Sequence, residues 1–487
     1  MADPPGLRSR ICLQFREGEA PAELLRHGSA GASPSRPMNL QVPKPDDLLR
    51  EGDFLGNTLT NKLDDLLVQR NSGSFGFSLH IAYQSLRLPM DRRSFLATSA
   101  AAGLAMHPVS NAVAVQPQSV PIGKDVGLKL ITADPLVLET SDSLLAANRI
   151  TPSSALFVRN HHGAKHLEDM QSRPMTGELE ITGLVDKPTR FPLSELAKMT
   201  KTEVEMVLQC SGNFRFQFSK LSPIKGTPWN KGAIGNVRFA GVRISDFLKA
   251  AGVTASKEAK YLTAEGADQP EKKDQIDYEK SIPLDIAIER GILATELNGV
   301  ALPAVHGGPL RLVIPGYYGN VQVKWLTKLR LEATETVNFF QLPDYRTPKQ
   351  RIEPGAPVEY TFENSDPNFD MKVNSRIFAP EDGSMIAAGK KIDLRGVAWN
   401  DGSADLVAVE WSQDQGASWK SSRLSASAGP YAFREWTSSA TFEKGEHFLW
   451  IRAVDALGRT QPMDGRLFWN PGGYGWNAIE KIRVTAV

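Results

Sequence analysis

Cysteine is nearly absent from this sequence, since Cys12 and Cys210 are the only two among 487 residues. Two cysteines cannot form a framework of several disulfides. The sequence also contains no Cys-x-x-Cys-His motif, so we expect no haem in this chain and a separate chain for any haem partner.

Long apolar runs and an excess of charge are missing as well. No apolar run reaches the roughly 18–20 residues that a membrane-spanning helix requires. The formal net charge is +1, so no overall field attracts nucleic acid or an anionic membrane, and we expect neither as a partner. The composition, with 41% hydrophobic and 23% charged residues, is ordinary for a globular protein, and the length allows two or three domains.

The first quarter of the chain differs in composition from the rest. Residues 1–89 are rich in Gly, Pro, Ser and Arg and lack a sustained period, which predicts disorder or sequence upstream of the true start. A folded N-terminal domain is the alternative. From Met90, MDRRSFLATSAAAGLAMHPVSNAVAVQ combines paired Arg92-Arg93, a weakly apolar stretch and an A-x-A site at 112–114. This order is typical of a twin-arginine export signal over 90–114 and predicts a periplasmic protein, although a surface helix with a chance arginine pair fits too.

Residues 115–365 alternate short apolar runs with turn signals, which predicts a mixed α+β domain with irregular connections. We expect strands in 177–188 and 204–210, a buried strand broken by Pro-Gly in 310–319, and helices in 191–199 and 242–252. Residues 366–487 have short strands at regular spacing, with period-two apolar residues in 391–399, 406–412 and 447–456. This tail predicts an all-β immunoglobulin-like sandwich without a disulfide, which alone would suggest an interaction module.

Cys210 stands at the end of the predicted strand VEMVLQC, just before a Gly212-Asn213 turn signal. A lone cysteine is most often a small buried hydrophobic residue. Here the turn can expose the thiol, and Arg215 would favour the thiolate. A soft thiolate suits a transition metal, and one cysteine can complete a metal site if an organic cofactor supplies the remaining sulfur ligands.

The segment LQCSGNFR resembles the cysteine motif Gln-Cys-Ala-Gly-Asn-Arg-Arg of the sulfite oxidase family of molybdenum enzymes. Further segments resemble that family in the same order over about residues 130–487. These segments are LFVRNHHG (156–163), GAIGNVRFAGVRISDFL (232–248), AEGAD (264–268), SIPLDIAI (281–288), ELNGVALPAVHGGPLRLVIPGYYGNVQVKWL (296–326) and PDYR (343–346). The resemblance implies a molybdopterin-binding catalytic domain over 115–365 and, over 366–487, a sandwich domain that forms a homodimer interface.

The resemblance also implies roles for individual residues. Cys210 would be the thiolate ligand to molybdenum, and the dithiolene of one molybdopterin would supply two further sulfurs. Arg159 and Arg215 match the arginines of the oxyanion pocket, where a planar guanidinium suits an oxyanion, and Tyr345 matches the tyrosine that reaches the substrate. The residues that match positions holding the pterin and its phosphate are Asn160, His161, Asp268, His306, Arg311 and Lys324.

Two departures from the family pattern concern the substrate. Phe214 replaces the first of two arginines, and Gly472, in WNPGGYGWNA (469–478), stands where animal sulfite oxidases have another pocket arginine. Each lost charge-assisted contact would weaken binding of the sulfite dianion by about 1.5–3 kcal/mol. Arg346, Lys165 or His166 could compensate. The cofactor is therefore predicted more directly than the substrate.

The resemblance implies oxidation of sulfite, or a related small oxyanion, to sulfate by oxygen-atom transfer, with electrons passed to a separate c-type cytochrome. A periplasmic methionine-sulfoxide reductase-like molybdoenzyme is the enzymatic alternative, although that group usually lacks the sandwich tail. A non-catalytic binding protein on the same scaffold is the third hypothesis. The retained Cys210 and phosphate-holding set argue against it.

Overall fold

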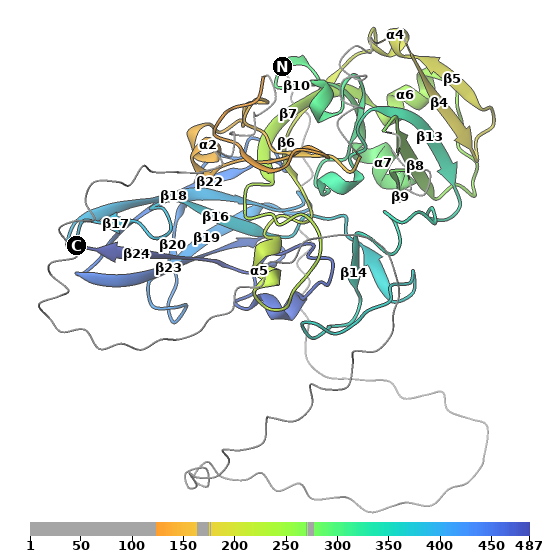
Figure 1. Ribbon diagram of the computed structural model, residues 1–487. Coiled ribbons are helices and arrows are strands. Elements are labelled where there is room, and N and C mark those ends of the chain that lie inside the picture. The colour runs from red at the N-terminus through yellow and green to blue at the C-terminus, as the bar shows by residue number, and fades with distance from the viewer. Residues whose placement is uncertain (1–122, 163–174, 176, 269, 271–276) are drawn as a thin grey trace, which may run out of the picture. The chain divides into compact units, whose positions relative to one another are not determined.

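The computed structural model describes residues 123–162, 175, 177–268, 270 and 277–487, which lie in one compact unit, residues 110–487 (Figure 1). The predicted export signal and the segment before it lie outside the described residues, as do Cys12, Lys165 and His166. Within the part of the chain that the structure describes, no helix is long and apolar enough to cross a membrane.

The strand that leads to Cys210 lies in a five-stranded antiparallel sheet. This strand, β6 (Thr202–Gln209), pairs with β7 (Ile234–Arg243), and both are buried over much of their length, which explains their apolar sequences. The order is β11-β10-β7-β6, with β12 on β10. The remaining strands are β10 (Ile292–Leu297), β11 (Val300–Ala301) and β12 (Arg311–Val313).

A second five-stranded sheet has the order β5-β4-β13-β8-β9 (Figure 1), and its buried residues form part of the hydrophobic core of the first domain. It is mixed, because β13 pairs parallel with β4 and antiparallel with β8. Its strands are β4 (Glu178–Gly183), β5 (Thr189–Pro192), β8 (Tyr261–Gly266), β9 (Glu279–Pro283) and β13 (Leu326–Glu332). The helices that contribute to this core are α4 (Leu193–Leu196), α6 (Ile244–Ala250) and α7 (Leu284–Arg290).

The remaining elements of this part of the chain are short, and β3, η1 and η2 among them contribute to the pocket described below. The first three strands form a small sheet, and β14 pairs with β15. These elements are β1 (Lys129–Thr132), β2 (Val137–Glu139), α2 (Asp142–Ala147), β3 (Val158–Arg159), α5 (Arg215–Ser219), the 3-10 helices η1 (Ala304–His306) and η2 (Gly319–Val321), β14 (Arg346–Pro348) and β15 (Ser365–Pro367).

Each predicted strand and helix of this domain is present, but several differ in extent. The helix predicted over 191–199 is wrong in extent, because β5 continues to Pro192 and only Leu193–Leu196 is helical. The helix predicted over 242–252 begins later, since β7 continues to Arg243. The strand predicted within 310–319 is Arg311–Val313, and the Pro-Gly pair breaks it as predicted, with Gly316 at φ +86°.

The C-terminal residues form two sheets that share a hydrophobic core. One sheet has the order β16-β18-β22-β21 and the other β17-β24-β23-β19-β20 (Figure 1). The elements are β16 (Asn374–Ala379), β17 (Met385–Ile386), β18 (Lys391–Trp399), β19 (Leu406–Ser412), β20 (Lys420–Ser421), β21 (Arg423–Leu424), β22 (Arg434–Thr441), β23 (Gly445–Asp455), β24 (Glu480–Ala486) and the 3-10 helix η3 (Gly465–Phe468).

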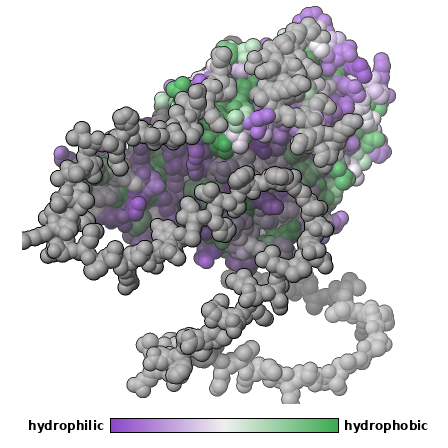
Figure 2. All heavy atoms as spheres, viewed as in Figure 1, coloured by the Kyte–Doolittle hydropathy of each residue, from purple (hydrophilic) through white to green (hydrophobic). Residues whose placement is uncertain are grey.

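The period-two pattern of the tail marks its core. In β23, Leu449, Ile451 and Ala453 are fully buried and face the core that both sheets share, whereas the alternate residues are more exposed. The predicted strands over 391–399, 406–412 and 447–456 are thus confirmed. On the face that Figure 2 shows, hydrophilic residues predominate around scattered hydrophobic ones.

Buried polar contacts join the two domains. The Arg376 guanidinium is fully buried and forms an ion pair with Asp142, which also pairs with Lys231 at 2.8 Å. Near the cysteine, the Trp399 Nε1–H donates to Gln209 Oε1 at 2.8 Å. The C-terminal domain therefore contacts the residue directly before Cys210.

We expect Asp142→Asn to lower the free energy of unfolding by about 3 kcal/mol, because removing one partner leaves the buried Arg376 charge uncompensated. The measurement is urea unfolding followed by tryptophan fluorescence. The matched control is Glu180→Gln, whose partner Arg190 has a side chain that is 69% exposed, so that the loss should stay below about 1 kcal/mol. Equal losses in the two variants would contradict a stabilising role for the Arg376 pair.

Candidate active site

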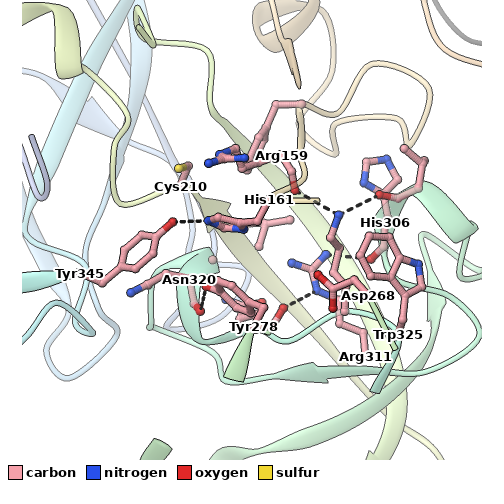
Figure 3. Close-up of a pocket in the computed structure, with 16 residues that line it drawn as sticks. Arg159, His161, Cys210, Asp268, Tyr278, His306, Arg311, Asn320, Trp325 and Tyr345 are labelled. Atoms are coloured by element: carbon pink, nitrogen blue, oxygen red, sulfur yellow. Dashed lines mark hydrogen bonds between the residues drawn. The ribbon is translucent and has the colours of Figure 1, made fainter. Parts of the chain in front are cut away.

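One pocket gathers side chains from distant parts of the first domain (Figure 3). β3 and the residues after it provide Arg159 and His161, and the end of β6 leads into Cys210. Tyr345 directly precedes β14. The other lining residues are Phe157, Leu208, Asp268, Tyr278, Val305, His306, Arg311, Gly319, Asn320, Gln322, Lys324 and Trp325.

Cys210 lies at one end of the pocket, beside Arg159 (Figure 3). Its backbone N–H donates to the Ala233 carbonyl at 2.9 Å, and its carbonyl accepts from Asn213 N–H at 2.9 Å. Asn213 Oδ1 also accepts from Ala233 N–H at 3.1 Å. These bonds fix the predicted turn after the strand and leave the thiol partly exposed in the pocket.

His161 and Tyr345 form a hydrogen-bonded pair at the same end, with 2.7 Å between His161 Nε2 and the Tyr345 hydroxyl (Figure 3). Burial holds the pKa of His161 well below its ordinary value, and burial raises the pKa of Tyr345. Both groups are therefore neutral near pH 7, and the tyrosine hydroxyl keeps its proton. The His161 ring stacks on Tyr278 at 4.5 Å, which fixes its orientation.

The other end of the pocket is rich in buried cationic groups. Arg311 Nη1 donates to the His306 carbonyl at 2.9 Å, and Lys324 Nζ donates to the Arg159 carbonyl at 3.1 Å and to Asn160 Oδ1. Burial and the Arg311 charge hold the pKa of Lys324 well below its ordinary value. Burial raises the pKa of Asp268 to about 7, although Lys324 opposes this shift.

These groups suit an anionic ligand with hydrogen-bonding edges. Among the described residues, no carboxylate forms an ion pair with Arg159, Arg311 or Lys324, although Asp268 favours the charged form of Lys324, so these groups can still take an anion as partner. Asn320 Oδ1 and Gln322 Oε1 line the pocket, are buried and have no hydrogen-bond partner. A phosphate and a heterocycle with N–H groups would satisfy both requirements.

A metal at Cys210 would need ligands from outside the chain. In the described ranges, no group of three or more His, Cys, Asp or Glu side chains is arranged to hold a metal ion. A molybdopterin fits this pocket, because it brings sulfur ligands together with an anionic phosphate and a polar ring.

Most of the predicted site residues line this one pocket. They are Arg159, His161, Cys210, Asp268, His306, Arg311, Lys324 and Tyr345. Asn160 is buried beside the pocket and bonds Lys324.

Arg215 does not line the pocket. Its guanidinium donates to the carbonyls of Thr227, at 2.9 Å, and Gly472, at 3.0 and 3.2 Å. The structure thus places Arg215 against the cysteine turn, where a Cβ on Gly212 would lie 2.7 Å from its Nη2.

Sequence reasoning missed Tyr278, Asn320, Gln322, Trp325 and Lys124. Lys124 Nζ lies 3.0 Å from His306 Nε2, and Trp325 packs under Lys324 with Nζ 4.2 Å from its ring centroid. Asn320, Gln322 and Trp325 lie in YYGNVQVKW (317–325), and the polar residues between apolar ones in this segment were the available signal. Tyr278 and Lys124 carried no such signal.

Two family models match the chain. The model described as "Oxidoreductase molybdopterin binding domain" matches residues 166–340, and "Mo-co oxidoreductase dimerisation domain" matches residues 365–486. The two domains and the pocket therefore define a molybdopterin-dependent oxidoreductase.

Curated relatives include sulfite oxidases and, at 28% identity, a nitrate reductase (NADH) of Ulva prolifera. The chain is 30% identical to the Gallus gallus sulfite oxidase over 71% of this chain and 75% of that protein. It is 32% identical to the mitochondrial sulfite oxidase of Drosophila melanogaster over 74% of this chain and 63% of that protein, so it spans less than two thirds of that relative. Among solved structures, the sulfane dehydrogenase SoxCD of Paracoccus pantotrophus matches with a TM-score of 0.61 and 25% identity, over 76% of this chain and 91% of that one. The chain belongs to the sulfite oxidase family of molybdenum enzymes.

Proposed function

We propose that this protein oxidises sulfite to sulfate with a molybdenum ion held by Cys210 and one molybdopterin. The observation that carries the proposal is a lone pocket thiol beside Arg159, at one end of a buried pocket whose other end is cationic. In the overall reaction, sulfite and water give sulfate, two protons and two electrons. The bound cofactor would supply the oxygen-atom transfer chemistry.

The residues of the chain bind and orient the reactants. Arg159 would bind an oxyanion next to the metal end, and the Tyr345 hydroxyl, which keeps its proton, would donate a hydrogen bond to a substrate oxygen. The proposed cofactor ligands act at the other end. His306, Arg311 and Lys324 would hold the phosphate, Asp268 would accept from ring N–H groups, and Asn160 and His161 would hold the pterin.

The proposal extends to partners and location. The two electrons would pass to a separate c-type cytochrome, since the sequence has no haem-attachment motif. A homodimer through residues 366–487 agrees with the dimerisation-domain match, and the two sheets with one core suit an immunoglobulin-like topology. Residues 90–114 would direct export to the periplasm by the twin-arginine route, and residues 115–365 would form the catalytic domain.

The test is stopped-flow absorbance of the molybdenum-loaded protein mixed with sulfite. Rapid bleaching of the visible thiolate-to-molybdenum band by sulfite supports the proposal, and a loaded protein that does not respond to sulfite contradicts it. Because the donors of Arg215 are bonded to carbonyls, Arg159 is the guanidinium that the pocket offers beside Cys210, which favours a sulfane sulfur substrate as the second candidate. Mixing with a sulfane compound, and oxidation of the reduced protein by methionine sulfoxide, distinguish the alternatives.

We expect Arg159→Met to raise the KM for sulfite about 10- to 150-fold, because a charge-assisted contact contributes about 1.5–3 kcal/mol. Arg159→Lys should give a smaller rise, since it keeps the charge but loses the planar fork. The matched control is Arg238→Met, which removes a half-exposed guanidinium that pairs with Glu205 and does not line the pocket. Steady-state reduction of ferricyanide measures KM, and an unchanged value in Arg159→Met would remove Arg159 from the substrate site.

A further inference from the structure

A tyrosine of the C-terminal domain packs on the pocket tyrosine. The Tyr474 ring stacks on the Tyr345 ring with centroids 4.7 Å apart and planes at 25°. The Tyr474 hydroxyl donates to Asp344 Oδ1 at 2.5 Å. Both tyrosines are buried, and Tyr474 belongs to the hydrophobic core of the first domain rather than to the core of the two C-terminal sheets.

Tyr345 has a backbone conformation that needs support from its surroundings. Its φ is +55°, in the left-handed region that bulky residues rarely adopt. Its carbonyl accepts from Asn368 N–H at 2.8 Å, and Asp344 N–H donates to the Phe339 carbonyl at 3.0 Å. Tyr474 therefore supports Tyr345 in two ways: its ring stacks on the Tyr345 ring, and its hydroxyl bonds the carboxylate of the preceding residue, Asp344.

The loop that carries Tyr474 is also fixed to the cysteine turn. Gly475 N–H donates to the Ser211 carbonyl at 2.8 Å, and the Gly472 carbonyl accepts from Arg215. The Arg215 guanidinium carbon lies 5.1 Å from the centroid of the Tyr474 ring. One short loop thus contacts both the thiol-bearing turn and Tyr345.

The glycine at 472 makes room for this ring. A Cβ on Gly472 would lie 2.4 Å from Tyr474 Cε2, too close for any side chain unless the tyrosine moves. An arginine at this position is therefore incompatible with the observed placement of Tyr474.

We propose that Tyr474 is a positioning residue. It keeps the Tyr345 hydroxyl hydrogen-bonded to His161, and turnover therefore depends on the C-terminal domain. This inference rests on the proposed function, since it assigns Tyr345 to the substrate. Gly472 then serves to admit the Tyr474 ring.

The test is a double-mutant cycle on the molybdenum-loaded protein. Tyr474→Leu is expected to lower kcat/KM for sulfite about 10- to 100-fold, because a displacement of about 1 Å in a reacting group has effects of that size. Tyr474→Phe keeps the ring and should lose less, and Gly472→Ala should resemble Tyr474→Leu. In a Tyr345→Phe background, Tyr474→Leu should change kcat/KM by no more than about twofold, since its effect acts through the missing hydroxyl. A full further loss in that background would overturn the proposal.

A second readout does not depend on turnover. In Tyr474→Leu, hydrogen exchange should become faster in the peptide 339–348, which contains the strained residue, whereas unchanged exchange there would overturn the proposal. The control is Tyr431→Phe, a tyrosine of the same domain that does not line the pocket, and it should leave both readouts unchanged. If the loaded wild type does not oxidise sulfite, the proposed function fails, and hydrogen exchange still tests whether Tyr474 holds Tyr345. If the wild type oxidises sulfite but the Tyr474 effect is additive, only the inference fails.

Discussion

Replacing Cys210 by serine is expected to lower sulfite oxidation by more than about 100-fold, because substitutions that merely disturb the orientation of metal ligands already cost about 10–100-fold. Serine is close to cysteine in size, so the backbone bonds to Ala233 and Asn213 should persist and the fold should remain. A hydroxyl is a harder and more basic donor than a thiolate, and it does not replace sulfur as a ligand to a soft site. The measurement is sulfite-dependent reduction of ferricyanide, normalised to molybdenum content.

The neighbouring residue offers a matched control for that variant. Ser211 Oγ is buried and has no hydrogen-bond partner, so Ser211→Ala changes the same turn without removing a ligand or a bond. It should keep the activity of the wild type. If Cys210→Ser retained a tenth or more of that activity, the thiol would not be the metal ligand.

Local sequence patterns predicted the parts of the structure that depend on local chemistry. The turn after β6 follows from Gly212-Asn213, and the thiol stands where a strand end leaves it partly exposed. In β23 the alternation of Leu449 and Ile451 with more polar residues marked the face that is buried. Period-two burial acts over a few residues, so a single sequence is enough to recognise it.

Contacts between distant segments could not be predicted in this way. Arg215 was expected in the oxyanion pocket, but its partner Gly472 is 257 residues away, and only the folded chain reveals that carbonyl. The stack of Tyr474 on Tyr345 also joins two domains and leaves no periodic signal. Helix ends were misplaced for a related reason, because pairing in β5 and β7 extends strands into residues that have helical spacing.

The second large effect is expected for the cationic end of the pocket. Lys324→Met should lower the molybdenum and pterin content per chain about 10- to 100-fold at limiting cofactor, because a buried charge-assisted contact to a phosphate contributes about 1.5–3 kcal/mol. Methionine fills a similar volume, so packing against Trp325 should persist. Metal analysis together with fluorescence of the oxidised pterin measures both parts of the cofactor.

The control for Lys324→Met is Lys328→Met, a lysine of β13 that pairs with Glu265 and has a side chain that is 30% exposed. It removes the same charge from a neighbouring position and should retain the wild-type content of molybdenum and pterin. Equal cofactor loss in the two variants would mean that net charge, and not the Lys324 contact, governs binding. Full retention in Lys324→Met would contradict the phosphate site at this end of the pocket.

The two parts of the cofactor can also respond differently. If molybdenum is lost while pterin remains, Lys324 acts on the metal end of the pocket through the Arg159 carbonyl, to which its Nζ donates at 3.1 Å. We expect molybdenum and pterin to be lost together. Burial and the Arg311 charge lower the pKa of Lys324, and a phosphate bound beside Lys324 would favour its charged form.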